Sequence, residues 1–122
     1  MINIFAVFFG GGLGSLLRYG ISKLTISFYS GNFPLATFIS NILSCIILIF
    51  TVKKKKKIVD SELMRVFLIT GICGGFSTFS TFSFETFSLI KTGHYTIALV
   101  NIVLSLFVGI GLIYFLLKNQ GQ

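Results

Sequence analysis

Charged residues are scarce in this sequence of 122 residues, and acidic residues are scarcer still. Charged residues make up 11% of the chain, against about 25% in typical soluble domains. Only Asp60, Glu62 and Glu85 are acidic, whereas 54% of the chain is hydrophobic and 15 residues are Phe. So few charges exclude an ordinary soluble domain of this size. The composition therefore predicts a membrane protein.

Cysteines are few as well. Cys45 and Cys73 each lie within an apolar run and lack the spacing of metal ligands, so we interpret both as buried small hydrophobic residues. The ten basic residues give a net charge of +7, but five of them form one block, residues 53–57. The sequence has no basic stripe with interleaved aromatic side chains, which excludes a nucleic-acid partner.

Four long runs of the sequence carry almost no charge. They cover residues 2–24, 34–52, 64–90 and 95–117. The hydrocarbon core of a bilayer is about 30 Å thick, and a helix needs about 20 residues to cross it. We therefore predict an all-α membrane protein in which residues 1–122 form a single domain of four transmembrane helices. A polybasic loop, residues 53–57, connects the second helix to the third.

The predicted loops differ in basic charge. If the N-terminus lies in the cytoplasm, seven basic residues face inside, five of them in the block 53–57. The three that face outside are Arg18, Lys23 and Lys91. The positive-inside rule then favours a multi-pass protein of the cell membrane with one fixed orientation and both termini in the cytoplasm.

The first predicted span contains a cluster of small residues: Gly10, Gly11, Gly12, Gly14 and Ser15. Small residues four positions apart let helix backbones approach closely in lipid. The pattern fits packing within one chain and packing between two chains equally well. Because four short helices leave little interior space, we expect a transport pathway to need a second subunit.

The third predicted span is unlike the others. Between Gly71 and Glu85 it carries the paired glycines Gly74 and Gly75, followed by five serine or threonine residues. Glycine costs about 1 kcal/mol in a helix, and hydroxyl side chains compete for its backbone groups. The pattern predicts a helix break around residues 74–78. Free carbonyl oxygens there would suit a hard cation, and the positive end of the restarted helix would favour an anion.

Several side chains in the spans allow two interpretations. Polar groups are costly to bury in lipid, so Asn41, Asn101 and Ser105 face either a partner helix or a transport pathway. A hydrogen bond between helices explains each of them as well as a pathway does. Phe79 and Phe82 either only pack against apolar neighbours or contact a small anion through the positive edges of their rings.

The third span reads Gly-Ile-Cys-Gly-Gly-Phe-Ser-Thr-Phe-Ser-Thr-Phe-Ser from Gly71 to Ser83. This motif closely resembles the signature of the Fluc/CrcB family of fluoride channels. Residues 10–19 resemble the opening motif of that family, and residues 34–41 are similar to its Gly-Thr-x-x-x-Asn segment, with Ala36 in place of the glycine. The resemblance covers the whole chain. It implies an antiparallel dimer with two pores, which passes F⁻ out of the cell down its gradient.

The resemblance also implies roles for individual residues. The implied pore-lining residues are Asn41, Phe79, Phe82, Ser80, Thr81, Ser105 and Asn101. Arg18 would lie in the vestibule, and the backbone carbonyls of Gly74 and Ser77 would bind a structural Na⁺ between the two subunits. Some family members have Tyr at the position of Asn101 and Ser at that of Gly109.

A channel makes and breaks no covalent bond, so the chain is not expected to be an enzyme. Its expected partners are the fluoride ion, the lipid bilayer and a second channel subunit, which is either an identical copy or a paralogue. The alternative function is that of a small four-span, proton-coupled multidrug exporter. Such carriers depend on a Glu in the first span, and this sequence has none there. Glu85 follows the motif and is either a carboxylate at the membrane edge or part of the ion pathway.

Overall fold

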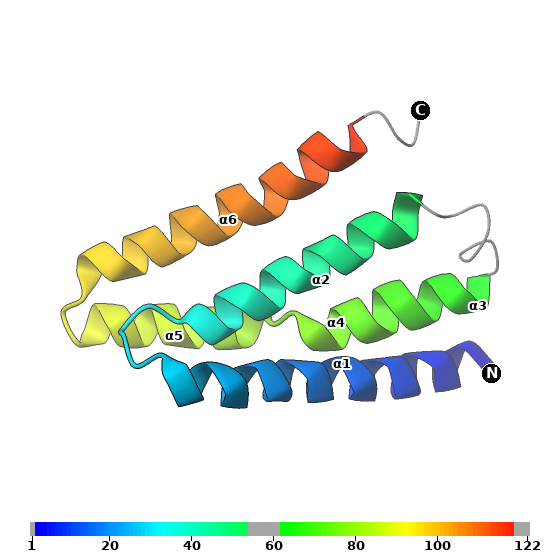
Figure 1. The fold of residues 1–122 in the computed structure, drawn as a ribbon, viewed down its shortest axis with the longest axis horizontal. Coiled ribbons are helices and arrows are strands. Elements are labelled where there is room, and N and C mark those ends of the chain that lie inside the picture. Colours follow the sequence, from blue (N-terminus) through cyan, green and yellow to red (C-terminus); the bar gives the residue numbers. More distant parts are fainter. Residues whose placement is uncertain (1, 54–61, 119–122) are drawn as a thin grey trace.

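The computed structural model describes residues 2–53 and 62–118 of the chain. Within these residues the fold contains helices and no strands (Figure 1), which confirms the predicted all-α class. The elements are α1 Ile2–Phe28, α2 Leu35–Lys53, α3 Glu62–Arg65, η1 Val66–Cys73, α4 Gly74–Phe76, α5 Phe79–Lys91 and α6 Tyr95–Leu117. Four stretches, α1, α2, Glu62–Lys91 and α6, are long and apolar enough to cross a membrane. The chain is therefore a multi-pass membrane protein.

The first helix extends further than the predicted span. α1 continues past residue 24 to Phe28, so Lys23 lies within the helix rather than at its end. The ammonium group of Lys23 lies 5.9 Å from the centre of the Tyr19 ring, one turn earlier on the helix. A long lysine side chain can cover apolar surface in this way, so the charge does not end the helix. Of the predicted polybasic loop, only Lys53 lies within the described residues, as the last residue of α2.

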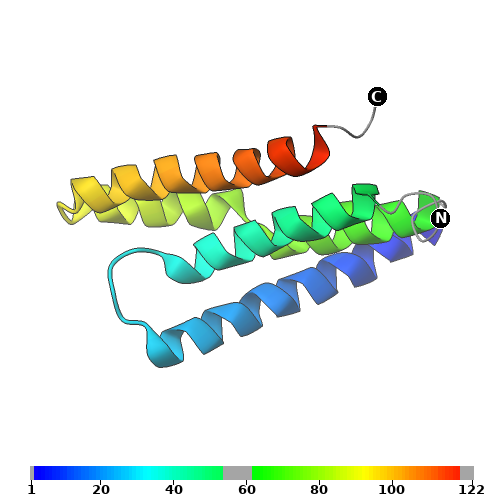
Figure 2. The ribbon, with the colours of Figure 1, turned by 45° about the horizontal axis from the view of Figure 1, so that its top comes forward.

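Helix α2 lies in the middle of the bundle (Figures 1 and 2). It has α1 on one side and α6 on the other, and it also contacts η1. α1 packs along η1 and α4, whereas α5 packs against α6. The start of α1 and the last residues of α2 and α6 lie at the same end of the bundle. The connections 29–34 and 92–94 lie at the opposite end.

Glycines bring α1 into close contact with η1 and α4. A Cβ atom on Gly10 would lie 3.0 Å from the Gly71 Cα atom, and one on Gly14 would lie 2.8 Å from the Phe76 backbone nitrogen. These distances leave no room for a side chain. A Cβ atom on Gly12, in contrast, would have no other atom within 4 Å. The glycine cluster of the first span therefore serves packing within the chain through Gly10 and Gly14.

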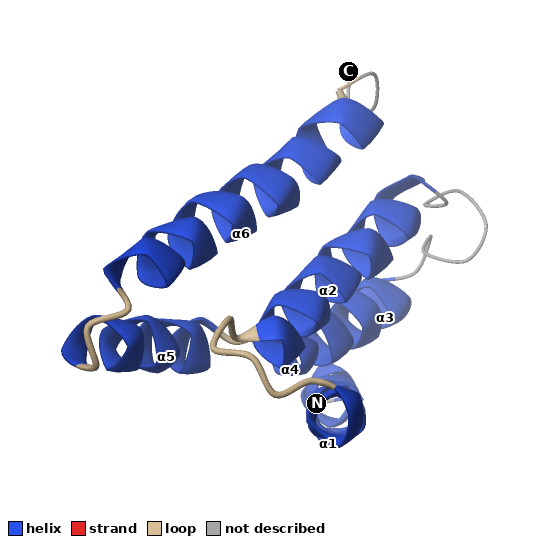
Figure 3. Ribbon diagram, turned by 60° about the vertical axis from the view of Figure 1, so that its left-hand side comes forward, coloured by secondary structure: helices blue, strands red, loops and turns tan. Residues whose placement is uncertain are grey.

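The helical geometry of the third span stops for two residues. After α3 the span continues as η1, a π-helical stretch of a kind often found at functional sites, and α4 ends at Phe76. Ser77 (φ −85°, ψ 157°) and Thr78 (φ −152°, ψ 119°) then have extended backbone. Gly74, which the sequence pattern included in the break, has helical φ and ψ values of −64° and −36°. After Thr78 the chain continues in a new direction as α5, beside α6 (Figure 3).

Candidate functional site

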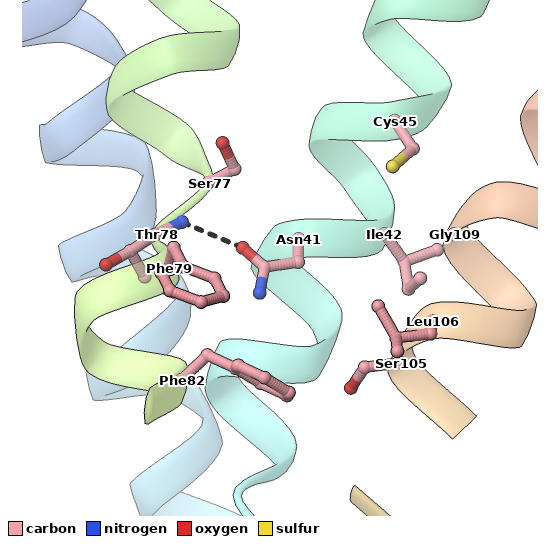
Figure 4. Close-up of a pocket in the computed structure, with 10 residues that line it drawn as sticks. All are labelled: Asn41, Ile42, Cys45, Ser77, Thr78, Phe79, Phe82, Ser105, Leu106 and Gly109. Atoms are coloured by element: carbon pink, nitrogen blue, oxygen red, sulfur yellow. Dashed lines mark hydrogen bonds between the residues drawn. The ribbon is translucent and has the colours of Figure 1, made fainter. Parts of the chain in front are cut away.

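A pocket with a volume of about 230 Å³ lies where the helical geometry of the third span stops (Figure 4). Its lining residues are Asn41, Ile42, Cys45, Ser77, Thr78, Phe79, Phe82, Ser105, Leu106 and Gly109. They come from α2, α5, α6 and the extended residues before α5. The pocket thus brings together the predicted pore residues Asn41, Phe79, Phe82 and Ser105 and the predicted carbonyl donor Ser77.

Asn41 is oriented by the extended backbone. Its Oδ1 atom accepts a hydrogen bond of 2.9 Å from the Thr78 backbone N–H. In a continuous α-helix this N–H would donate to the Gly74 carbonyl, so the side-chain amide replaces a helical hydrogen bond. Because Oδ1 is engaged, the Nδ2 group points away from Thr78, toward the side where Phe82 and Ser105 lie (Figure 4). It offers two N–H donors there.

Phe79 and Phe82 form the α5 side of the pocket. Their ring centroids are 6.1 Å apart, and the ring planes are inclined by 35°. The edge of a phenyl ring carries partial positive charge, so rings in this position can contact an anion without a formal charge. Phe82 is half-buried, whereas Phe79 is 79% exposed. A single chain therefore leaves the Phe79 side of the pocket open.

Hydroxyl groups gather at the start of α5. Thr78 is the N-cap of this helix, because its Oγ1 atom accepts a hydrogen bond of 3.2 Å from the Thr81 backbone N–H. The same hydroxyl donates to Thr81 Oγ1 at 3.2 Å and lies 3.3 Å from Ser80 Oγ. Ser80 and Thr81, both predicted to line the pore, thus meet at the helix N-terminus rather than in the pocket wall. Thr78 is not among the predicted site residues, although a hydroxyl residue directly before a helix is a typical N-cap.

Asn101, for which the resemblance implies a pore-lining role, does not border this pocket. Its side chain is 1% exposed. Its Nδ2 atom donates to Thr86 Oγ1 at 2.9 Å, and its Oδ1 atom accepts from Ser105 Oγ at 3.4 Å. The Asn101 side chain is directed toward Thr86 on α5, and it also contacts Ser105, which lines the pocket.

Arg18 binds the end of α4. Its Nε atom donates a hydrogen bond of 3.1 Å to the Gly75 carbonyl oxygen. The last carbonyl groups of a helix lack partners within the helix and carry partial negative charge, so a guanidinium group stabilises them. Arg18 therefore lies beside the end of α4, on the side that faces α1, and outside the pocket lining.

The two predicted metal-binding residues border different cavities. Ser77 lines the pocket, whereas Gly74 borders a groove between α1 and η1 together with Gly71 and Gly75. Within residues 2–53 and 62–118 no group of three or more His, Cys, Asp or Glu side chains could hold a metal ion.

The remaining candidate residues are buried or half-buried. Both cysteines are free thiols. Cys73 is buried, as predicted, and its Sγ atom donates to the Ser44 carbonyl at 3.4 Å, while Cys45 is half-buried in the pocket wall. Glu85 Oε1 and Ser40 Oγ are buried and have no hydrogen-bond partner in the described part of the chain. The Oε1 atom of Glu85 is therefore shielded from water within the single chain.

Comparison with known proteins identifies the family. Residues 5–117 match the family described as "CrcB-like protein, Camphor Resistance (CrcB)". A Flavobacterium psychrophilum protein named fluoride-specific ion channel FluC is 42% identical over 111 residues, which cover 90% of each chain. A Pyrococcus abyssi protein of the same name is 46% identical over 107 residues, which cover 86% of this chain and 85% of the relative. These findings confirm the resemblance that the motifs indicated, and the chain belongs to the CrcB family.

Proposed function

We propose that this chain is a subunit of a fluoride-selective channel, which lets F⁻ leave the cell passively and so lowers the cytoplasmic fluoride concentration. The observation that carries the proposal is the pocket that gathers Asn41, Phe79, Phe82 and Ser105. The name shared by the relatives, fluoride-specific ion channel, supports the same function. Movement of an ion through such a pocket breaks no covalent bond, so the protein is not an enzyme.

The pocket supplies weak donors in place of water. F⁻ would exchange hydration water for the two N–H groups of Asn41, the hydroxyl group of Ser105 and the positive edges of Phe79 and Phe82. None of the described residues that line the pocket is charged. The anion therefore meets enough donors to enter and no formal charge that would hold it back. The N-terminus of α5, which begins at Phe79, adds partial positive charge on the same side.

Positive charge outside the pocket would attract the anion first. Arg18 uses one N–H group on Gly75, and a guanidinium group has five such donors. The remaining donors are available to an anion in a vestibule beside the end of α4. Ser80 and Thr81, at the start of α5, would extend a polar path from the vestibule toward the pocket. This assigns roles to the two hydroxyl residues that lie outside the pocket wall.

We further propose that two subunits pair in antiparallel orientation and share a structural Na⁺. The backbone carbonyls of Gly74 and Ser77 would hold the ion, which supplies a fixed positive charge between the two extended segments. Carbonyl oxygens are hard ligands that suit such a cation. The surroundings of Gly74 fit this role, because a Cβ atom there would meet no other atom within 4 Å and the Thr78 N–H is bound to Asn41 instead. The exposed Phe79 ring would pack against the partner subunit.

The distribution of basic residues supports one fixed orientation in the cell membrane. Lys53 ends α2 and Lys118 follows α6, at the end of the bundle where α1 begins, whereas Lys91 ends α5 at the opposite end. The positive-inside rule then puts both termini in the cytoplasm. An antiparallel partner would need the opposite bias, which favours a paralogue. A reporter fused to the C-terminus should give a signal from the cytoplasmic side alone, and equal signals from both sides would contradict this orientation.

Fluoride efflux from liposomes that contain only the purified chain tests the proposed function. We expect fluoride to leave when a potassium ionophore balances its charge, without a proton gradient, while chloride stays inside. Efflux that appears only after a paralogous subunit is added would identify a heterodimer. Fluoride retention in both preparations would overturn the proposal, and cation export coupled to protons would instead support the multidrug exporter.

A further inference from the structure

We infer that Asn101 is a positioning residue, which acts through Thr86 to fix Phe82 relative to Ser105 across the pocket. The inference rests on the proposed function, because it concerns the geometry of the proposed fluoride pathway. It assigns to Asn101 a role behind the pocket wall, where the sequence analysis expected a pore-lining residue.

Three hydrogen bonds link the two sides of the pocket. Ser105 Oγ on α6 donates to Asn101 Oδ1 at 3.4 Å, and Asn101 Nδ2 donates to Thr86 Oγ1 at 2.9 Å. Thr86 Oγ1 then donates to the Phe82 carbonyl oxygen on α5 at 2.8 Å. The two ends of this chain of bonds, Ser105 and Phe82, line the pocket, whereas Asn101 and Thr86 do not. We call these four residues the α5–α6 link.

The donors and acceptors of the α5–α6 link allow only one arrangement. The Thr86 hydroxyl group has a single proton, which it gives to the Phe82 carbonyl, so its oxygen can only accept from Asn101. This fixes which end of the Asn101 amide faces α5 and leaves its oxygen for Ser105. Thr86 and Asn101 are 8% and 1% exposed, so water cannot replace a lost partner. A buried polar group left without a partner is costly, which makes the link behave as a unit.

The α5–α6 link lies where it can fix the separation between Phe82 and Ser105 in the pocket. α6 contacts both α2 and α5, and the direction of α5 changes after the extended residues Ser77 and Thr78 (Figure 3). The link joins α5 to α6 beside the pocket, at the turn that carries Phe82. Without it the Phe82 ring and the Ser105 hydroxyl would no longer be held at one separation. Contacts between an ion and a ring edge weaken when this separation changes.

The chain contains a matched control for Thr86. Thr51 Oγ1 on α2 donates to the Ile47 carbonyl at 2.8 Å, which is the same bond to the preceding turn that Thr86 makes to Phe82. Thr51 is 5% exposed, close to the value for Thr86. The bond of Thr51 stays within its own helix, whereas Thr86 also accepts from Asn101. Valine at each position removes the hydroxyl group and keeps the shape of the side chain.

Fluoride efflux of matched variants tests the inference. We expect Thr86→Val and Asn101→Leu each to slow fluoride efflux at least about tenfold, because each leaves buried groups of the link unpaired. Thr86→Ser, which keeps the hydroxyl group, and Thr51→Val should stay within about twofold of the wild type. The double variant Thr86→Val/Asn101→Leu should be no slower than the slower single variant, because both changes break one link. Efflux from Thr86→Val equal to that from Thr51→Val, or multiplied losses in the double variant, would overturn the inference.

A second measurement does not depend on conduction. A fluorine label on the Phe82 ring reports the surroundings of that ring through its magnetic resonance signal. We expect Thr86→Val and Asn101→Leu to shift this signal to the same new position and Thr51→Val to leave it unchanged. An unchanged signal in all three variants would show that the Phe82 ring does not depend on Asn101. A wild-type chain that passes no fluoride, either alone or with a paralogous subunit, would overturn the proposed function, and the labelled ring would still decide this inference.

Discussion

Replacing Phe82 with isoleucine is expected to slow fluoride efflux from liposomes at least about tenfold, which corresponds to about 1.4 kcal/mol. Isoleucine fills much of the same space and keeps the apolar contacts of α5, so the protein should still fold and assemble. It has no aromatic ring and therefore no positive edge that could face an anion. Phe82 lies in the pocket on the side to which the Asn41 amide points, so the substitution removes a ring from the proposed path of the anion (Figure 4).

Phe107 provides the control for this substitution. It lies on α6, outside the pocket lining, and is 74% exposed. Phe107→Ile makes the same chemical change on the outer surface of the bundle and should leave fluoride efflux within about twofold of the wild type. If both variants release fluoride at the wild-type rate, ring edges have no role in the pathway. If both variants are slower than the wild type by the same factor, the substitution acts through packing rather than through the pocket.

Replacing Gly14 with alanine is expected to have the largest effect on stability. The added Cβ atom would collide with the Ile72 carbonyl oxygen and the Phe76 backbone nitrogen. Backbone atoms of a packed helix cannot move aside as the end of a flexible side chain can, so α1 would have to separate from η1 and α4. Overpacking of this kind costs about 1–3 kcal/mol. We expect a lower temperature of unfolding and a loss of the assembled species in size-exclusion chromatography.

Gly20→Ala is the matched control on the same helix. A Cβ atom on Gly20 would meet no other atom within 4 Å. Alanine is favoured over glycine in a helix by about 1 kcal/mol, so this variant should unfold at the wild-type temperature or above it. If Gly14→Ala were as stable as Gly20→Ala, the close contact between α1 and α4 would not contribute to the fold.

The overall class of the fold could be predicted because composition reports directly on the membrane. Runs of about 20 residues without charge permit few structures other than transmembrane helices. The gathering of Asn41 and Ser105 with Phe79 and Phe82 could be expected only through the family resemblance, since Asn41 and Ser105 are far from the two phenylalanines in sequence. The structure adds the bond between Thr78 N–H and Asn41, which gives the amide its direction.

Other features depend on contacts between helices, which a single sequence does not reveal. The spacing of Asn101 and Ser105 places both on one face of α6, but it cannot show that Asn101 turns toward Thr86 on α5. The glycines of the first span illustrate the same limit. Their spacing fits packing within or between chains, and only the positions of Gly71 and Phe76 show that Gly10 and Gly14 are used within the chain.

The most direct test of the account is the fluoride efflux of the purified Asn41→Asp variant. The substitution replaces the amide NH₂ group with oxygen and keeps an oxygen that can accept from Thr78 N–H. The backbone around the pocket should therefore stay as it is, while the two N–H donors directed into the pocket are lost. We predict that the variant assembles like the wild type but releases fluoride no faster than liposomes without protein. Efflux at the wild-type rate would contradict the claim that the Asn41 amide lies on the path of the anion.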